Sequence, residues 1–102
     1  MTDQILSIAD MTSRVKAAFT ASRVAPDIAD CVADALIRAE CDGKSGHGLS
    51  RVGSYAAQAR SGKVDGFARY TVTHPKPATM AVDVAGGFAY PALAAVNRDL
   101  PA

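Results

Sequence analysis

Hydrophobic residues in the first half of the chain recur every three or four positions, which is the spacing of an amphipathic helix. The first such segment runs from Asp10, the expected N-cap, to about Ser22. A second segment opens at Pro26 and Asp27, where proline and a carboxylate suit the first helical turn, and it ends at Gly43. The apolar faces are Met11, Val15, Ala18 and Phe19 in the first segment and Ile28, Val32, Ala35, Leu36 and Ala39 in the second.

A third helix is expected after the glycine-rich turn at 43–48. It runs to about Arg60, and Gly62 closes it in the usual C-terminal role of glycine. Its inward residues are Leu49, Val52, Ala56 and Ala59. The sequence thus predicts three helices within residues 10–61.

Near Gly66 the pattern changes to the alternation that is typical of strands. Residues 70–73 are rich in β-prone side chains, two prolines then force a turn or bridge, and residues 80–85 alternate. Residues 5–8 could form a short edge strand, and Pro91 can start a last helix. The predicted fold class is therefore α+β, with three helices followed by short strands and a final helix.

Composition narrows the possible functions. The 102 residues allow one domain at most, and 49% of them are hydrophobic, as in a globular protein. The net charge of +1, without a cluster of Lys and Arg, argues against binding to nucleic acid or an anionic membrane. We find no membrane-spanning apolar run and no signal-peptide pattern, so we expect a cytoplasmic protein.

The two cysteines carry little chemistry in this pattern. Cys31 and Cys41 fall on the second predicted helix, about 15 Å apart along its axis. A disulfide needs Cα atoms within about 7 Å of each other. We therefore expect two reduced thiols, with Cys31 packed in the core, and no metal site, because no Cys/His spacing resembles one.

Three side chains of complementary chemistry lie at or just after the glycine-rich turn. His47, Arg51 and Tyr55 are four residues apart, so on one continuous helix they would share a face, since each residue turns by about 100°. An imidazole can move a proton, and a guanidinium can bind a carboxylate through two hydrogen bonds. The spacing indicates a site for a small acid, although a solvated helix face would show the same pattern.

Further matching runs lie on both sides of this motif. They are Ala-Glu-Cys-Asp-Gly at 39–43, Ser-Gly-Lys-Val at 61–64 and Ala-Val-Asp-Val-Ala-Gly-Gly-Phe at 81–88. Together with His47-Gly48, they resemble the type-2 malate/L-lactate dehydrogenase family, which also includes ureidoglycolate, sulfolactate and piperideine-carboxylate oxidoreductases. Gly46 stands where many members have the serine of a Ser-His-Gly motif, and Ser45 is one residue early.

The resemblance implies a fold distinct from the Rossmann arrangement and an oxidoreductase that transfers a hydride between NAD or NADP and a small 2-hydroxy or 2-oxo acid. The acid would be of the malate, lactate, sulfolactate or ureidoglycolate type. His47 would then accept or donate the proton, and Arg51 would hold the substrate carboxylate. Tyr55 would either donate a hydrogen bond to the substrate or pack. Since Gly46 has no hydroxyl, either Ser45 would take the place of the family serine or the backbone and the cofactor would orient His47.

Family members are about three times longer than this chain. The resemblance therefore implies that residues 1–102 are a single N-terminal segment, helical over 10–62 and entering a mixed α/β part at 66–102, with the cofactor-binding residues elsewhere. It also implies a homodimer. Two other interpretations stay open: a non-catalytic helical self-association module derived from such an enzyme, and a small helix-turn-helix-like nucleic-acid binder, which the charge disfavours.

Overall fold

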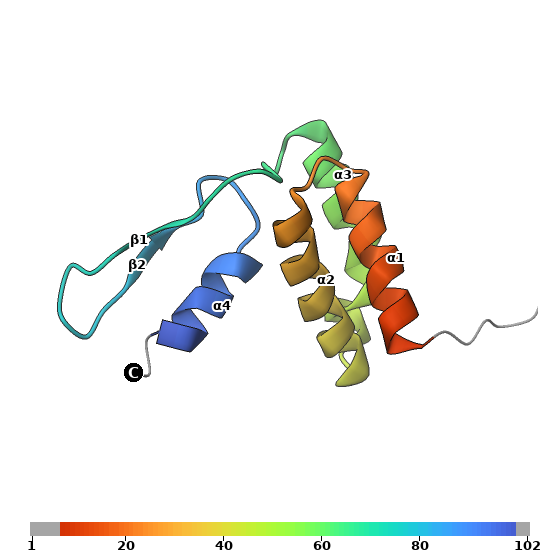
Figure 1. Ribbon diagram of the computed structural model, residues 1–102, viewed down its shortest axis with the longest axis horizontal. Helices are drawn as coiled ribbons and strands as arrows, with labels where there is room; N and C mark the ends of the chain where they lie inside the picture. Colours follow the sequence, from red (N-terminus) through yellow and green to blue (C-terminus); the bar gives the residue numbers. More distant parts are fainter. Residues whose placement is uncertain (1–6, 100–102) are drawn as a thin grey trace, which may run out of the picture.

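The computed structural model describes residues 7–99 and shows an α+β fold, as the sequence predicts (Figure 1). Three helices form a bundle, and a two-stranded hairpin and a fourth helix extend from one side of it. The elements are α1 (Ile8–Thr20), α2 (Pro26–Cys41), the 3₁₀ turns η1 (Ser45–His47) and η2 (Leu49–Arg51), α3 (Val52–Ser61), β1 (Thr71–Thr73), β2 (Ala81–Asp83) and α4 (Tyr90–Asp99).

The start of α1 differs from the prediction. Ser7 is its N-cap, and the Ser7 hydroxyl accepts a hydrogen bond from the amide of Asp10, so Asp10 lies in the first turn instead of capping it. Serine is as good a cap as aspartate, and the sequence alone did not separate the two. The predicted strand at 5–8 is wrong at Ile8, which is helical, while residues 5 and 6 lie outside the described residues.

The second helix follows the prediction closely. Pro26 occupies its first turn, and the helix ends in a Schellman arrangement in which the amides of Gly43 and Lys44 donate to the carbonyls of Glu40 and Ala39. Gly43 has φ +80°, a conformation that glycine adopts without steric cost. This end of α2 turns the chain directly into the segment that carries the candidate residues.

The third helix begins later than predicted. Residues 45–51 form two 3₁₀ turns, in which the amide of His47 donates to Lys44 and the amide of Arg51 donates to Gly48. Regular α-helix starts only at Val52, and it ends at Gly62, which has φ +82° and closes the helix as predicted.

The hydrophobic core lies between the three bundle helices. Phe19, Leu36, Val24 and Val32 are its largest fully buried side chains, and Ala56 and Ala59 supply the small inner face of α3. Burying a Phe or Leu side chain stabilises a fold by about 1.5–3 kcal/mol. α2 lies between α1 and α4 (Figure 1), so it is the element that joins the two parts of the molecule.

A close backbone crossing fixes the chain between α3 and the hairpin. The amide of Ala25 donates to the carbonyl of Gly66 at 3.0 Å, and a Cβ on Gly66 would lie 2.1 Å from the carbonyl oxygen of Arg23. Arg69 then forms a two-bond ion pair with Asp27 at the start of α2. These contacts set the direction in which the hairpin leaves the bundle.

The hairpin is short and antiparallel, with Val72 paired to Val82. Its turn holds both predicted prolines, and its described sheet contains these two strands alone. Figure 1 shows it reaching away from the helices, which gives the molecule extents of 56 × 30 × 21 Å. A two-stranded hairpin is marginal by itself in water. Within residues 7–99, we find no helix with the length and apolar character needed to cross a membrane.

Candidate functional site

The segment that carries the candidate residues is tied to the last turn of α2. Glu40 accepts a hydrogen bond from the backbone amide of Leu49 at 2.9 Å through its Oε1 atom. Gly48 is buried against the same side chain, and a Cβ at Gly48 would lie 2.8 Å from that oxygen. The loop backbone therefore rests directly on Glu40.

His47 ends η1 and is exposed. Its backbone amide is used in the turn, where it donates to the carbonyl of Lys44 at 2.9 Å. An exposed imidazole on a short, hydrogen-bonded turn can meet a ligand from solvent and exchange a proton with it. Ser45 begins the same turn, two residues before His47.

Arg51 is held by the loop that precedes it. Its Nε atom donates to the carbonyl of Gly46 at 2.7 Å, and its backbone amide donates to the carbonyl of Gly48 at 3.0 Å. The side chain is exposed, and its bond to Gly46 fixes one edge of the guanidinium fork. The other edge carries the two terminal nitrogens that a carboxylate would need for a bidentate contact.

Tyr55 is half-buried in an aromatic cluster. Its ring lies 6.0 Å from that of Phe88 and 6.4 Å from that of Tyr90, and Phe88 in turn meets Phe19 edge to face at 6.0 Å. The hydroxyl oxygens of Tyr55 and Tyr90 are 3.5 Å apart. The Tyr55 ring therefore packs against aromatic neighbours, and its hydroxyl faces the phenol of Tyr90.

Tyr90, the first residue of α4, connects this cluster with the loop. Burial raises the pKa of Tyr90 to about 12, and the hydroxyl of Tyr55 adds to the rise, while the positive charge of Arg51 opposes it. The positive charge of Arg51 lowers the pKa of Tyr90 because it favours the ionised form of the phenol. Tyr90 thus stays protonated at neutral pH and can serve as a hydrogen-bond donor.

The predicted stripe on one continuous helix is wrong. His47, Arg51 and Tyr55 lie in η1, η2 and α3, because the 3₁₀ turns interrupt the helix on which the spacing argument depended. A local hydrogen bond instead joins Arg51 to Gly46, and tertiary contacts bring Tyr55 to Phe88 and Tyr90.

Sequence reasoning gave no role to Tyr90 and quoted Glu40 only as part of a motif. Tyr90 meets Tyr55 across 35 positions, and Glu40 meets Leu49 across nine. Neither separation produces a local pattern. The small glycine at position 48, which leaves space for a neighbouring side chain, was the one available signal.

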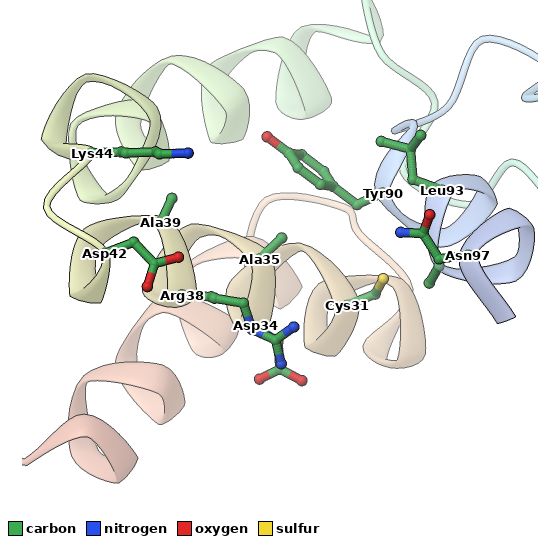
Figure 2. Close-up of a pocket in the computed structure, with 11 residues that line it drawn as sticks. Cys31, Asp34, Ala35, Arg38, Ala39, Asp42, Lys44, Tyr90, Leu93 and Asn97 are labelled. Carbon is green, nitrogen blue, oxygen red and sulfur yellow. The ribbon is translucent and has the colours of Figure 1, made fainter.

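A groove of about 580 Å³ separates α2 from α4 (Figure 2). Lys44 lies at the end of the groove next to the loop, and Figure 2 shows its amine and the phenol of Tyr90 pointing into the space between them. His47, Arg51 and Tyr55 do not line it. The groove and the candidate loop therefore adjoin at Lys44 and Tyr90 without forming one enclosed cavity.

Other reactive side chains lie apart from this loop. Cys31 and Cys41 are free and share α2 as predicted, but Cys31 is half-buried beside the groove instead of lying in the core. Burial raises the pKa of the Cys31 thiol, and the carboxylate of Asp34 adds to the effect. His74 is exposed in the hairpin turn, with its Nδ1 3.2 Å from the carbonyl oxygen of Thr79.

The glycines before α4 serve packing. A Cβ at Gly87 would lie 2.9 Å from the Cβ of Ala68 and 3.1–3.2 Å from two carbonyl oxygens, so protein atoms fill the space beside it. Gly86 has φ +78° and forms the turn itself. The segment is therefore a tightly packed turn between β2 and α4.

The chain belongs to the malate/L-lactate dehydrogenase family, whose sequence model matches residues 6–100.

Two curated relatives are informative. The chain is 42% identical, over 101 residues, to a (2R)-3-sulfolactate dehydrogenase (NADP⁺) of Chromohalobacter salexigens. The alignment covers 96% of this chain and 29% of that enzyme. It is also 35% identical, over 94 residues, to a Δ1-pyrroline-2-carboxylate/Δ1-piperideine-2-carboxylate reductase of Pseudomonas syringae pv. tomato. This alignment covers 92% of the chain and 27% of the reductase.

The fold has a close counterpart among solved structures. The crystal structure of Δ1-piperideine-2-carboxylate reductase from Pseudomonas syringae matches it with a TM-score of 0.89 and 33% identity, over 97% of this chain and 30% of that one. The chain thus spans about 30% of the length of the relatives it matches.

Proposed function

We propose that this chain is the N-terminal, substrate-facing segment of an oxidoreductase that transfers a hydride between NAD or NADP and a small 2-hydroxy or 2-oxo acid. The observation that carries the proposal is the loop at 45–51, which presents an exposed His47 and an anchored Arg51 in a chain that belongs to the dehydrogenase family. The names of the relatives support it, since each denotes an enzyme of a small organic acid.

The substrates in those names share a carboxylate, and one of the names specifies NADP⁺. In a reaction of this class, the nicotinamide cofactor supplies or accepts the hydride. Arg51 would bind the substrate carboxylate through its terminal nitrogens, while Gly46 holds its Nε. His47 would take the proton from the substrate hydroxyl in oxidation and return it in reduction.

Two further residues complete the proposed site. Tyr55 would orient its hydroxyl, together with that of Tyr90, toward the substrate end of the loop. Ser45, which begins η1, would take over the role of the family serine, because this chain has Gly46 at that serine's position. We assign no cofactor contact to any residue of this chain.

The remainder of the enzyme would supply the cofactor site. We propose that residues 1–102 form one segment, with its helical part at 10–62 and the start of a mixed α/β part at 66–102. A homodimer is proposed as well, supported by the exposed apolar side chain of Leu93 beside the groove. A cytoplasmic location is in keeping with two free cysteines.

A chimera tests the function directly. Residues 1–102 replace the matching segment of the sulfolactate dehydrogenase, and turnover is followed through the absorbance of the reduced nicotinamide. His47→Ala should lower kcat roughly a hundredfold or more, the usual contribution of a positioned acid or base. Arg51→Lys should chiefly raise KM, because a point charge replaces a two-bond fork.

Matched controls make the result specific. His74→Ala and Arg14→Lys change the same residue types at exposed positions outside the loop and should leave kcat and KM within about twofold. Equal and mild effects of all four substitutions would contradict the proposal. The 102-residue chain alone should show no dehydrogenase activity.

One observation favours a second candidate function. The groove between α2 and α4 exposes Leu93, which is 53% accessible, and such a surface suits association with another protein copy. The chain would then be a non-catalytic module derived from such an enzyme. The chimera separates the two candidates, because a mere association module would not make turnover depend on His47.

A further inference from the structure

We propose that Glu40 is a positioning residue for the candidate site: its carboxylate fixes the loop at 45–51 so that His47 and Arg51 present their side chains together. The inference rests on the proposed function for its consequence in catalysis. Its structural part, a clamp between Glu40 and the loop, stands on the contacts of this chain alone.

The first contact is a charge-assisted hydrogen bond. Glu40 lies in the last turn of α2, and its Oε1 accepts the amide hydrogen of Leu49 at 2.9 Å in a partly buried setting. Hydrogen bonds to an ionised acceptor are about twice as strong as neutral ones. Leu49 begins η2, so this bond attaches the start of the second 3₁₀ turn to the helix.

The second contact is steric. A Cβ at Gly48 would lie 2.8 Å from Oε1 of Glu40 and 3.0 Å from both its Cβ and its backbone nitrogen. A Cβ at Gly46, in the same loop, would have no atom within 4 Å. The two glycines therefore differ: the one at 48 is required by the close approach of Glu40, and the one at 46 is not.

The clamp leads directly to the candidate side chains. The carbonyl of Gly48 accepts the backbone amide of Arg51, and the carbonyl of Gly46 accepts its Nε. His47 stands between those two glycines. Holding Gly48 and Leu49 against Glu40 thus fixes both the carbonyls that orient Arg51 and the backbone that carries His47.

Hydrogen exchange and NMR on the 102-residue chain test the clamp without reference to catalysis. Loss of a hydrogen bond to a charged group costs about 1.5–3 kcal/mol, so Glu40→Ala should speed the exchange of the Leu49 amide roughly 10- to 100-fold. It should also broaden or shift the Nε–H signal of Arg51. Exchange of the Leu36 amide in the core should change little, which shows that the fold persists.

Three further variants separate position from charge and from general damage. Glu40→Gln keeps an oxygen that can accept the Leu49 amide and should restore protection to within a few-fold. Gly48→Ala should reproduce the effect of Glu40→Ala from the other side of the contact, whereas Gly46→Ala should not. Wild-type protection of Leu49 in Glu40→Ala would overturn the proposal.

The same variants in the chimera test the consequence for the reaction. Glu40→Ala should lower kcat/KM tenfold or more, and Glu40→Gln should recover most of it, a rescue that general loss of stability would not give. If the isolated chain yields no dispersed spectrum, exchange of the peptide 44–52 in the chimera is measured instead, with the same expected order. An open loop in Glu40→Ala with unchanged kcat/KM would overturn the positioning role. Failure of the His47 and Arg51 variants alone would instead reject the proposed function and leave the clamp intact.

Discussion

The hydroxyl oxygens of Tyr55 and Tyr90 lie 3.5 Å apart, although 35 positions separate the two residues in the chain. This contact joins α3 of the bundle to the first residue of α4, and Phe88 packs against the Tyr55 ring from the same connecting segment. The aromatic side chains thus fasten the C-terminal helix beside the loop that carries Arg51. Because the Tyr90 phenol is packed in this cluster, its pKa differs between the folded and the unfolded chain.

Alkaline pH should weaken the fold through Tyr90. Burial, reinforced by Tyr55, raises the pKa of Tyr90 to about 12, while an unfolded tyrosine ionises near 10. Between those values the unfolded chain holds fewer protons than the folded one. The stability that the Tyr90 phenol contributes is therefore complete below about pH 10 and is lost as the pH rises through 12. Thermal midpoints measured from pH 9 to pH 12 should fall less steeply for Tyr90→Phe than for the wild type.

Tyr70→Phe is the matched control, since it removes the same hydroxyl group from a tyrosine at the base of the hairpin, outside the Tyr55–Tyr90 contact. It should keep the wild-type slope. If Tyr90→Phe and the wild type lose stability in parallel above pH 10, the buried phenol does not have the environment described.

Gly66→Ala should destabilise the bundle. The new Cβ would lie 2.1 Å from the carbonyl oxygen of Arg23 and 2.8 Å from the Cα of Val24, and both are backbone atoms that cannot turn aside. Overpacking of this kind typically costs about 1–3 kcal/mol. The free energy of unfolding from urea titrations should fall accordingly.

Gly53→Ala provides the opposite expectation. Gly53 lies inside α3, and its Cβ would meet nothing within 4 Å, so the helix should gain about 0.5–1 kcal/mol from the loss of backbone freedom in the unfolded chain. Destabilisation of similar size at both positions would mean that the crossing of Gly66 over Arg23 is not the cause.

The sequence predicted the elements well where periodicity and end signals agreed. α2 has the predicted proline start and glycine end, and Ile28, Val32 and Leu36 of its predicted apolar stripe are buried. Ala35 and Ala39, predicted on the same face, are half-buried and line the groove toward α4 instead. The start of α1 was misplaced because Ser7 and Asp10 are both good caps, and only the fold chooses between them. The hairpin strands and α4 also lie where the alternation and Pro91 placed them.

The candidate site was less predictable. The spacing of His47, Arg51 and Tyr55 assumed one helix, but the amide of Leu49 bonds to Glu40 instead of entering a helix, and 3₁₀ turns result. Such a competition between a side chain and the helix is a tertiary effect, invisible to a periodic pattern. The approach of Tyr90 to Tyr55 depends on how α4 packs against α2, and no local signal carries that information.

Acid should loosen the attachment of the hairpin segment to α2. The hydrogen bonds from Arg69 lower the pKa of Asp27 below its ordinary value. The folded state therefore gains stability above the unfolded aspartate pKa of about 3.9, and loses it as the pH falls through the lower folded value. Because both side chains are exposed, the effect should be small and reduced by salt.

Arg69→Gln should remove most of this dependence below pH 4, as measured by thermal midpoints at low ionic strength. Lys63→Gln is the control, as it removes the same charge at an exposed position nearby. An equally large loss in both variants would indicate a general charge effect and not the Asp27–Arg69 pair.

The isolated chain should be marginally stable and should associate. Leu93 is 53% exposed beside the groove between α2 and α4, and the two-stranded hairpin has no third strand among the described residues. Exposed apolar surface of this kind favours self-association, and the associated form becomes more populated as the protein concentration rises. Sedimentation velocity should show a weight-average mass that increases with concentration, and thermal unfolding should be broad.

The groove can be tested by one charge. Leu93→Lys should shift the chain toward monomer, because a charge at the groove opposes burial against a second copy. Ile8→Lys is the matched control: Ile8 is 65% exposed at the start of α1, which Figure 1 places on the opposite side of α2 from α4. It should leave the association unchanged. A well-folded wild-type monomer with a sharp thermal transition at every concentration would show instead that this segment needs neither a partner copy nor further chain to be stable.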